Sequence, residues 1–319
     1  MQKFYSEFSI IEKYFNHSKV KRKDVLLGIG DDCALLKVPE NQILAVTIDT
    51  LVSGVHFFEN TPAYDLGYKS LAVSLSDLAA MGALPAWVTL AITLPKIDEN
   101  WLNDFCTGFF DLAKEFNVEL VGGNTTRGPL TITTQAHGFL PKDHALTRSG
   151  TKVGDAIYVT GTLGDSGLAL EMLLNKIKVS ENYREILLQK LNRPHPRVSE
   201  GLSLLKLANS AIDISDGLAA DLSHILEKSQ VGATIYVDDL PLSQALQNSV
   251  PMETALKLAL SSGDDYELCF TSSVQDLENF TKIGIIEVEP GLRIKYKNGE
   301  DFKIGSLGYE HQWNEYANN

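Results

Sequence analysis

Aspartates next to apolar stretches are the residues of this sequence best suited to chemistry. A carboxylate that faces an apolar cleft is costly unless a cation compensates its charge. Several carboxylates that converge repel one another and together hold hard divalent cations. All-oxygen ligands favour Mg²⁺ over zinc, and Mg²⁺ held by carboxylates usually also binds substrate phosphates. The sequence therefore predicts metal-dependent phosphate transfer. The four segments are Gly30-Asp31-Asp32, Thr47-Ile48-Asp49-Thr50, Ser76-Asp77-Leu78 and Asp213-Ile214-Ser215-Asp216-Gly217.

Three of these segments also have an ordinary interpretation, and the residues alone leave both open. The Asp31-Asp32 pair after a glycine is typical of an acidic turn as well as of a metal ligand. Residues 47–49 end an apolar strand, where a hydroxyl, a backbone carbonyl and a carboxylate reach one Mg²⁺, but Asp49 equally suits a helix N-cap. Asp77 lies inside an apolar helical pattern that disfavours aspartate, so it faces either solvent or a cation.

A second group of residues suits phosphate binding. Asp213 and Asp216 bracket the end of a strand-like run, and their spacing allows two metal contacts with Ser215 between them. Residues 120–128 are glycine-rich after a short strand, so their backbone N–H groups suit a phosphate, although such turns are common. The chain contains no G-x-x-x-x-G-K-[ST] motif and none of the protein-kinase signatures. A P-loop is therefore excluded.

Composition bounds the class of protein. The chain has 319 residues, which suggests two domains, and its 44% hydrophobic and 22% charged content is ordinary for a soluble globular protein. A net charge of −13 and a pI near 5.0 argue against a nucleic-acid partner. We expect no membrane association, because no apolar run reaches the roughly 18 residues of a membrane helix. The beginning of the chain lacks the layout of a signal peptide. Three separated cysteines without C-x-x-C spacing predict reduced thiols and a cytoplasmic location.

The elements that must position these residues follow from hydrophobic periodicity. The pattern predicts an α/β (or α+β) fold of two domains, with mixed sheets packed with helices. Turn formers and charges over 141–154 mark the boundary, which gives domains 1–145 and 146–319. Two prolines make 193–197 irregular. In the first domain we expect strands over 25–29, 43–48, 87–93, 118–121 and 130–139, with helices over 63–81 and 100–116. In the second domain we expect strands over 156–160, 211–214, 233–237, 267–271 and 282–288, with helices after the glycine-rich turn 161–167 and over 218–227.

Taken together, the motifs closely resemble the thiamine-monophosphate kinase family, which is related to aminoimidazole ribonucleotide synthetase, selenophosphate synthetase and the hydrogenase maturation factor. The resemblance implies a two-domain fold like that of aminoimidazole ribonucleotide synthetase. Its N-terminal domain would bind ATP and metal and form a homodimer through its sheet, and its C-terminal domain would be α/β. The alternation over 130–139 adds weak support for the dimer, because its apolar face suits a partner's. The segments that carry the resemblance are 28–34, 47–52 with His56, 76–83, 122–126, 146–150, 212–217 and 264–268.

The resemblance also assigns roles to single residues. It implies several Mg²⁺ ions as cofactors and ATP as co-substrate. The implied metal ligands are Asp32, Thr47, Ile48 through its carbonyl, Asp49, Asp77, Asn124, Asp213 and Asp216. The implied ATP contacts are Gly123, Asn124, Arg148 and Ser215, and the implied contacts of thiamine monophosphate are His56, Asp264 and Tyr309. Two residues depart from the family pattern. Asn124 stands where aspartate is usual, which removes one anionic ligand, and Asp264 stands where glutamate is frequent.

The implied reaction is transfer of a phosphoryl group from ATP to thiamine monophosphate, which gives thiamine diphosphate and ADP. A phosphate monoester has a second pKa of about 6, so the acceptor oxygen is already anionic and no residue is needed as a general base. The obstacle is repulsion between two anionic phosphates. Mg²⁺ bound by the aspartates neutralises both and aligns them for direct in-line transfer, and Arg148 adds positive charge at the ATP phosphates.

Two other functions fit the same motifs. One is a different ATP-dependent enzyme of the superfamily, because only His56, Asp264 and Tyr309 carry the choice of acceptor. The other is a non-catalytic, metal-dependent protein that binds a nucleotide or thiamine phosphate, which Asn124 keeps open. Release of ADP with and without thiamine monophosphate separates all three functions.

Overall fold

The chain folds into two compact units, which the computed structural model describes over residues 6–16 and 20–310. Unit 1 comprises the chain up to Thr147 together with Asn192–Leu207, and unit 2 comprises Arg148–Leu191 and the chain from Ala208 onward. The boundary expected at 145/146 lies two residues before the first crossing at 147/148. No sequence pattern indicated that 192–207 returns to unit 1.

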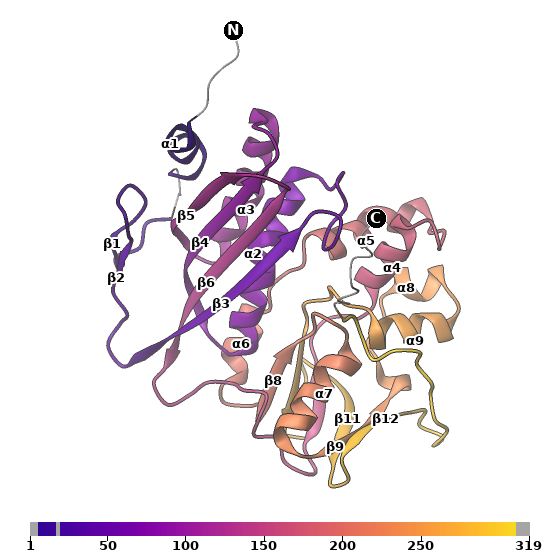
Figure 1. The fold of residues 1–319 in the computed structure, drawn as a ribbon. Helices are drawn as coiled ribbons and strands as arrows, with labels where there is room; N and C mark the ends of the chain where they lie inside the picture. The colour runs from indigo at the N-terminus through magenta and orange to yellow at the C-terminus, as the bar shows by residue number, and fades with distance from the viewer. Residues whose placement is uncertain (1–5, 17–19, 311–319) are drawn as a thin grey trace, which may run out of the picture. The chain divides into compact units, whose positions relative to one another are not determined.

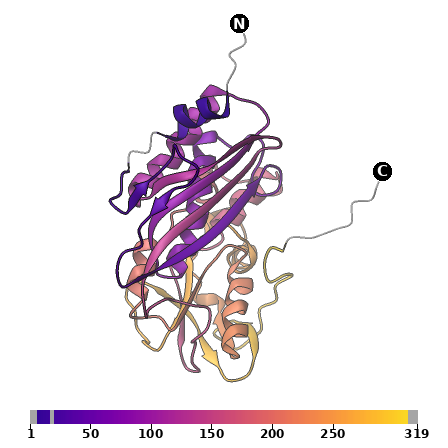
Figure 2. The same cartoon turned by 60° about the vertical axis from the view of Figure 1, so that its left-hand side comes forward.

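A four-stranded sheet with two long helices on one face forms unit 1 (Figures 1 and 2). The strand order is β3-β6-β4-β5; β6 is antiparallel to both of its neighbours, whereas β4 and β5 are parallel. This mixed sheet confirms the predicted fold class, and each strand continues past its predicted C-terminal end. The strands are β3 (Gln42–Val52), β4 (Leu84–Leu94), β5 (Glu119–Arg127) and β6 (Thr131–Pro141), and the helices are α2 (Ala63–Ala80) and α3 (Glu99–Glu115).

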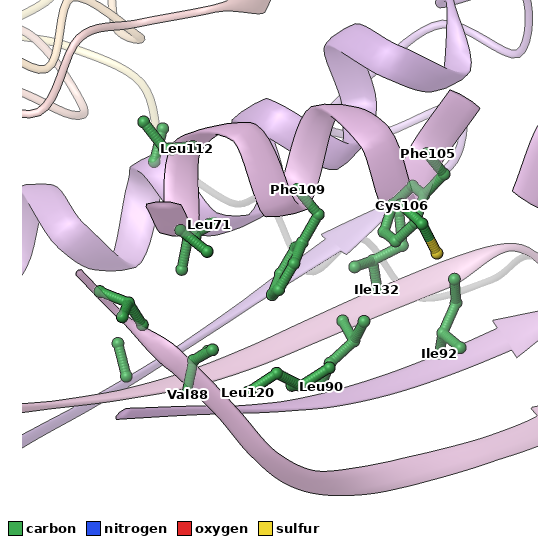
Figure 3. Close-up of a cluster of buried hydrophobic side chains, with 14 of the residues drawn as sticks. Leu71, Val88, Leu90, Ile92, Phe105, Cys106, Phe109, Leu112, Leu120 and Ile132 are labelled. Carbon is green, nitrogen blue, oxygen red and sulfur yellow. The ribbon is translucent and has the colours of Figure 1, made fainter. Parts of the chain in front are cut away.

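The core of unit 1 lies between the sheet and these helices. Phe105 and Phe109 of α3 point toward the sheet, where they join Leu90 and Ile132 in one buried cluster (Figure 3). Burial alternates along β6 because successive side chains of a strand point to opposite faces. The apolar face over 130–139, which the sequence analysis assigned to a dimer partner, is therefore covered by the unit's own helices.

Two glycines allow α2 and α3 to cross in direct backbone contact. A Cβ on Gly67 would lie 2.0 Å from the carbonyl oxygen of Phe105, and a Cβ on Gly108 would lie 1.9 Å from that of Tyr64. A larger residue at either position has to displace backbone. The crossing thus fixes α2 against α3 at a spacing that only glycine permits.

Shorter elements complete unit 1. β1 (Val25–Leu27) and β2 (Leu35–Leu36) form a hairpin that packs on Trp87 and Phe139, on the face of the sheet away from α2. α6 (Val198–Leu204) packs against α2. The segment 193–197, between α5 (Glu181–Asn192) and α6, is irregular as the prolines predicted. The chain opens with α1 (Glu7–Ile10) and a π-helical turn, η1 (Ile11–Phe15).

A six-stranded sheet forms the centre of unit 2, in the order β12-β9-β11-β7-β10-β8. All neighbours are antiparallel except β9 and β12. The sequence predicted every strand but β12, and of the helices only α4 and α7. The strands are β7 (Ala156–Val159), β8 (Ser210–Asp213), β9 (Gly232–Tyr236), β10 (Leu268–Ser272), β11 (Thr281–Glu287) and β12 (Gly291–Lys295). The helices are α4 (Asp165–Leu173), α5, α7 (Leu218–Ser229), η2 (Val237–Asp239), α8 (Gln244–Ser249) and α9 (Met252–Ser261). Within the described ranges of both units, no helix combines the length and apolar character that crossing a membrane requires.

The variant Gly108→Ala tests the helix crossing. Its methyl group would meet backbone rather than a flexible side chain, so we expect the free energy of unfolding to fall by about 1–3 kcal/mol. Gly122→Ala is the matched control in the same unit, because a Cβ there meets only the Thr89 methyl group at 3.9 Å. Urea unfolding measures both variants, and a Gly108→Ala protein as stable as its control contradicts the close crossing.

Candidate functional site

Two carboxylates of unit 1 face each other between the sheet and α2. Asp49 lies within β3, Asp77 lies near the end of α2, and the charge of Asp77 acts on Asp49. The Thr47 hydroxyl donates a hydrogen bond to the Asp77 carboxylate. Two open questions from the sequence are answered here. Asp49 is not a helix N-cap, because its strand continues to Val52, and Asp77 points to the sheet rather than to solvent.

Hydroxyl groups surround this carboxylate pair. Ser74 of α2 donates to Asp49 at 2.7 Å and lies 2.8 Å from the Thr134 hydroxyl of β6. Thr134 in turn donates to the Ser70 carbonyl at 2.6 Å. Ser74 and Thr134 were not among the predicted ligands. A signal for Ser74 existed, because it precedes Asp77 by three residues and so shares its helix face.

The electrostatics of the pair suit a bound cation. The pKa of Asp49 is raised to about 6, chiefly by burial and then by the negative charge of Asp77, against the hydrogen bond from Ser74. The side-chain atoms that could bind a metal here are all oxygens, which Mg²⁺ prefers. No set of three His, Cys, Asp or Glu side chains gathers as metal ligands in the described parts of the chain. The remaining ligands of a cation here would therefore be water, hydroxyl, carbonyl or phosphate oxygens.

Gly123 and Asn124 lie next to each other on β5 but on opposite faces of the sheet. Strand register puts Gly123 on the row of Asp49 and Asn124 on the next row, beside Ala91. Asn124 is exposed on the face away from α2. Gly123 has a φ of 151°, and a Cβ there would lie 1.9 Å from the Leu90 carbonyl oxygen, so only glycine fits. The structure does not bring Asn124 beside Asp49.

Two further predicted ligands of unit 1 are exposed. Asp32 lies between β1 and β2, where its N–H donates to the Asp31 carboxylate at 2.9 Å, as in the acidic turn that the sequence also allowed. Ile48 is 62% exposed, on the face of β3 opposite to Asp49. The ligand expected at this position is the backbone carbonyl oxygen of Ile48. The orientation of the side chain therefore does not test that expectation.

His56 lies half-buried in the loop that follows β3. The His56 Nδ1 accepts the Val52 backbone N–H at 3.0 Å, and the backbone N–H of His56 donates to the Val52 carbonyl at 3.0 Å. A neutral His56 therefore carries its proton on Nε2. That N–H is a suitable donor to a phosphate oxygen.

In unit 2, an aspartate that the sequence analysis did not single out holds the loop after β8. Asp221, in the first turn of α7, accepts the N–H groups of Ser215, Asp216 and Gly217 at 3.0, 3.1 and 3.1 Å. Burial raises the pKa of Asp221 to about 6, although these bonds oppose the rise. Successive N–H groups of this kind suit an external anion. Because Asp221 occupies these N–H groups, they are not available to such an anion.

Backbone hydrogen bonds bring the two predicted acceptor residues of unit 2 to this loop. The Asp264 N–H donates to the Ser215 carbonyl at 2.9 Å, and the Tyr309 N–H donates to the Asp216 carbonyl at 2.9 Å. The Tyr309 side chain is 51% exposed. Gly308 lies close enough to this loop that a Cβ would come within 2.6 Å of the Asp216 oxygen. Four predicted residues thus lie together.

The last two predicted residues lie at the ends of elements. Asp213 is the buried final residue of β8, opposite Leu268 of β10. Arg148 is exposed, and its carbonyl accepts the Ser229 hydroxyl at 3.2 Å. These placements do not test the roles that the sequence analysis assigned, and those roles stay predictions.

A cavity of about 300 Å³ in unit 1 lies elsewhere. Phe15, Arg22 and Glu119 line it together with residues 25–29, and none of the predicted site residues does. The charged groups at its wall are already bonded, since Glu119 accepts the Arg22 N–H at 2.6 Å. The predicted site residues therefore lie outside this cavity.

Asp49→Asn tests the carboxylate pair in the metal-free protein. The pKa of Asp49 is about 6 in the folded protein and 3.8 ordinarily. The folded protein therefore holds this proton more tightly than the unfolded chain, and the free energy of unfolding falls as the pH rises from about 4 to about 6. Asparagine removes this loss, so we expect the variant to be more stable than the native protein by about 1–3 kcal/mol at pH 7 but not at pH 4. Unfolding in EDTA at both pH values measures the difference. A variant that is less stable at pH 7 contradicts the repulsion.

Two family domains account for most of the chain. The N-terminal domain of the AIR synthase related proteins matches residues 30–140, and the C-terminal domain of the same proteins matches residues 152–294. The first match lies in unit 1. The second begins in unit 2 and spans the segment 192–207 that returns to unit 1.

Similarity to known proteins extends along nearly the full length. Thiamine-monophosphate kinase from Escherichia coli (strain K12) is 49% identical over 319 residues, which cover 96% of this chain and 98% of that protein. The crystal structure of thiamine-monophosphate kinase from Stenotrophomonas maltophilia K279a has a TM-score of 0.85 at 43% identity, covering 92% of this chain and 96% of that one. The structure of AaThiL complexed with AMPPCP and TMP has a TM-score of 0.75 at 30% identity, covering 95% and 99%. The chain therefore belongs to the thiamine-monophosphate kinases, within the AIR synthase related family.

Proposed function

We propose that this protein transfers a phosphoryl group from ATP to thiamine monophosphate and releases ADP and thiamine diphosphate. The observation that carries the proposal is the 49% identity to Escherichia coli thiamine-monophosphate kinase over 96% of the chain. The related AaThiL is complexed with AMPPCP and TMP. Local geometry supports the proposal, because each unit gathers residues suited to the reaction. They are Thr47, Asp49 and Asp77 in unit 1, and Ser215, Asp216, Asp264 and Tyr309 in unit 2.

Mg²⁺ is the proposed cofactor, with Asp49, Asp77 and the Thr47 hydroxyl among the ligands in unit 1. The bound cations supply neutralisation of phosphate charge and alignment for in-line transfer. The all-oxygen donor set and the raised pKa of Asp49 support this assignment, because a cation relieves a carboxylate that is costly when charged. Asp213 and Asp216 are the proposed ligands of unit 2, and Asp32 is the proposed ligand from the loop after β1.

Other residues act on the phosphates themselves. Ser215 offers its hydroxyl, since its N–H is already bonded to Asp221. Arg148 is exposed and supplies positive charge to the ATP phosphates. His56 donates to the acceptor phosphate through Nε2, because Nδ1 is already an acceptor. No side chain has to remove a proton, since the acceptor phosphate has a second pKa of about 6 and is ionised near neutral pH.

Release of ADP by the full-length protein tests the proposal against the two other functions. We expect release to require both thiamine monophosphate and Mg²⁺, with thiamine diphosphate formed in equal amount. Release of ADP at the same rate with and without thiamine monophosphate would indicate another ATP-dependent enzyme of the superfamily. Binding of ATP without any release, in the presence of thiamine monophosphate and Mg²⁺, would indicate a non-catalytic binding protein.

A homodimer formed through the sheet of unit 1, at its edge strand β3, is the proposed assembly. β3 is an edge strand, and across the described residues it pairs only with β6. Leu44, Val46 and Ile48 are 41%, 52% and 62% exposed on the face of β3 away from α2. A long edge strand with exposed apolar side chains is a template for association. Residues 130–139 no longer support the dimer, because their apolar face is covered by the helices of unit 1. The exposed apolar side chains of β3 support it instead.

Val46→Glu tests this surface by placing a charge in the middle of the apolar row. We expect sedimentation velocity at micromolar concentration to show a dimer for the native protein and a monomer for the variant. Val288→Glu is the matched control, because Val288 is 74% exposed in unit 2. A native monomer, or a dimer that survives Val46→Glu, contradicts the proposal.

Asn124→Asp tests the departure from the family pattern. Since Asn124 and Asp49 lie on opposite faces of the sheet, any cation at Asn124 differs from the one at Asp49. An anionic oxygen binds a hard cation more tightly than an amide carbonyl does. We expect the variant to reach half its maximal rate at lower Mg²⁺, and Thr126→Asp, an exposed position on the same strand, to leave the Mg²⁺ dependence unchanged. Superimposable curves for Asn124→Asp and the native protein remove Asn124 from the ligands.

A cytoplasmic location is also proposed. All three cysteines are free thiols, with Cys33 exposed and Cys106 and Cys269 buried. Unpaired cysteines are typical of proteins in a reducing compartment.

A further inference from the structure

The loop 262–267, which carries the proposed acceptor residue Asp264, has an uncommon backbone. Asp264 and Tyr266 have φ angles of 67° and 49°, a left-handed conformation that residues other than glycine rarely adopt. Such conformations persist only where the surroundings impose them. The groups that impose this one bear directly on where the Asp264 carboxylate lies.

One side of the loop is bonded to the chain that follows β8. The Asp264 N–H donates to the Ser215 carbonyl at 2.9 Å, and the Tyr266 N–H donates to the Ile214 carbonyl at 2.8 Å. Gly263 lies so close that a Cβ would come within 2.4 Å of the Ser215 oxygen. These contacts fix the position of the loop relative to the residues that follow β8.

The other side is bonded through Asp265 to the glycine-rich turn 161–167, whose last three residues begin α4. The proposed reaction assigns no role to this segment. The Asp265 carboxylate accepts the Gly164 N–H at 2.7 Å and the Ser166 N–H. The Ser166 hydroxyl donates to the Asp264 carbonyl at 2.9 Å. Gly164 has a φ of 85° and no room for a Cβ, which would lie 2.7 Å from the Ala259 nitrogen. The turn therefore presents its N–H groups to Asp265 at a fixed position.

The surroundings of Asp265 make this arrangement electrostatically unfavourable. Burial raises the pKa of Asp265 well above its ordinary value, and the charges of Asp165 and Glu267 add to the rise. A buried charge is weak evidence for a gain in stability, because an apolar group of similar volume often serves as well or better. An apolar side chain, however, would leave the N–H groups of Gly164 and Ser166 without this acceptor. Asp265 is therefore the acceptor that ties the loop to these two N–H groups.

We propose that Asp265 is a positioning residue for the phosphate acceptor, which joins the turn 161–167 to the loop 262–267 and so holds Asp264 at a fixed place beside Ser215. The inference rests on the proposed function, in which Asp264 contacts thiamine monophosphate and Ser215 contacts ATP. Asp265 touches neither substrate and acts through Asp264. An aspartate side chain is short, so the reach of its carboxylate depends on the backbone that carries it. A loop that shifts by a fraction of an ångström therefore weakens acceptor binding and leaves ATP binding intact.

Steady-state kinetics of the full-length protein tests the proposal with Asp265→Asn. The amide keeps the shape of the side chain but offers only one acceptor oxygen, and its NH₂ group opposes the N–H donors. We expect the KM for thiamine monophosphate to rise about tenfold, while the KM for ATP stays within about twofold and kcat changes little. Asp155→Asn is the matched control, because Asp155 is a buried carboxylate of unit 2 that also accepts a backbone N–H, that of Lys152 at 2.9 Å, but lies outside both the turn and the loop. We expect Asp155→Asn to lower stability and to leave both KM values unchanged.

A second variant keeps the test informative if Asp265→Asn does not fold. Ser166→Ala removes only the hydroxyl bond to the Asp264 carbonyl, and we expect a selective rise of about threefold in the KM for thiamine monophosphate. Equal rises in both KM values overturn the positioning role, as does an unchanged KM for thiamine monophosphate in folded variants.

Asp264→Asn separates this inference from the proposed function. If it leaves the KM for thiamine monophosphate unchanged, the proposed acceptor site is wrong and the positioning role falls with it. If it raises that KM while Asp265→Asn and Ser166→Ala do not, the acceptor site stands and only the positioning role is wrong.

Discussion

Repulsion between two aspartates held within reach of each other is the constraint around which unit 1 is arranged. Asp49 on β3 and Asp77 on α2 meet where the helix lies on the sheet, and the pKa of Asp49 is raised to about 6 there. A helix free to shift would relieve this repulsion. α2 is not free, because it contacts α3 at Gly67 and α6 near Ala79, and it is hydrogen-bonded to the sheet through Ser74. The packing thus maintains an arrangement suited to the proposed divalent cation.

Unit 2 uses carboxylates in a different way. Asp221 and Asp265 are inward-facing acceptors of backbone N–H groups, and each stabilises a loop that carries a proposed substrate contact. At α7, Asp221 takes the place that an external anion would otherwise occupy. The acidity of the chain, with its net charge of −13, therefore combines proposed metal ligands with internal anchors. An aspartate beside a predicted site is no guide to which of the two it is.

Much of the fold and the membership of the family were predictable from the sequence. Periodicity identified the strands of the unit 1 sheet, every strand of the unit 2 sheet except β12, and the long helices α2 and α3, and the order of the aspartate motifs indicated the family. The faces of residues were harder to predict. A strand has a period of two, so one irregular position reverses the face of every later residue. On β5, the register shift that skips Val121 and the conformation of Gly123 both precede Asn124, and no sequence pattern revealed them.

Contacts over long sequence separations were also beyond the sequence. The segment 192–207 packs in unit 1 although it follows a helix of unit 2, because the complement of its apolar side chains is α2 and not a neighbour in the chain. Asp265 had no role assigned from the sequence beyond its place in the segment 264–268, because its N–H donors at Gly164 and Ser166 lie about a hundred residues earlier. Ser74 alone had a local signal, its helical spacing from Asp77.

The most direct test of the central claim, that Asp49 and Asp77 are held together to bind a divalent cation, is the unfolding temperature of the full-length protein at pH 7 with Mg²⁺ and with EDTA. The account predicts that Mg²⁺ raises Tm in the native protein and in the control Asp104→Asn, which removes an exposed carboxylate of α3. It predicts that Asp77→Asn, which removes half of the pair, has a higher Tm in EDTA and gains less from Mg²⁺ than the native protein does. An equal rise in Tm for Asp77→Asn and the native protein contradicts the claim.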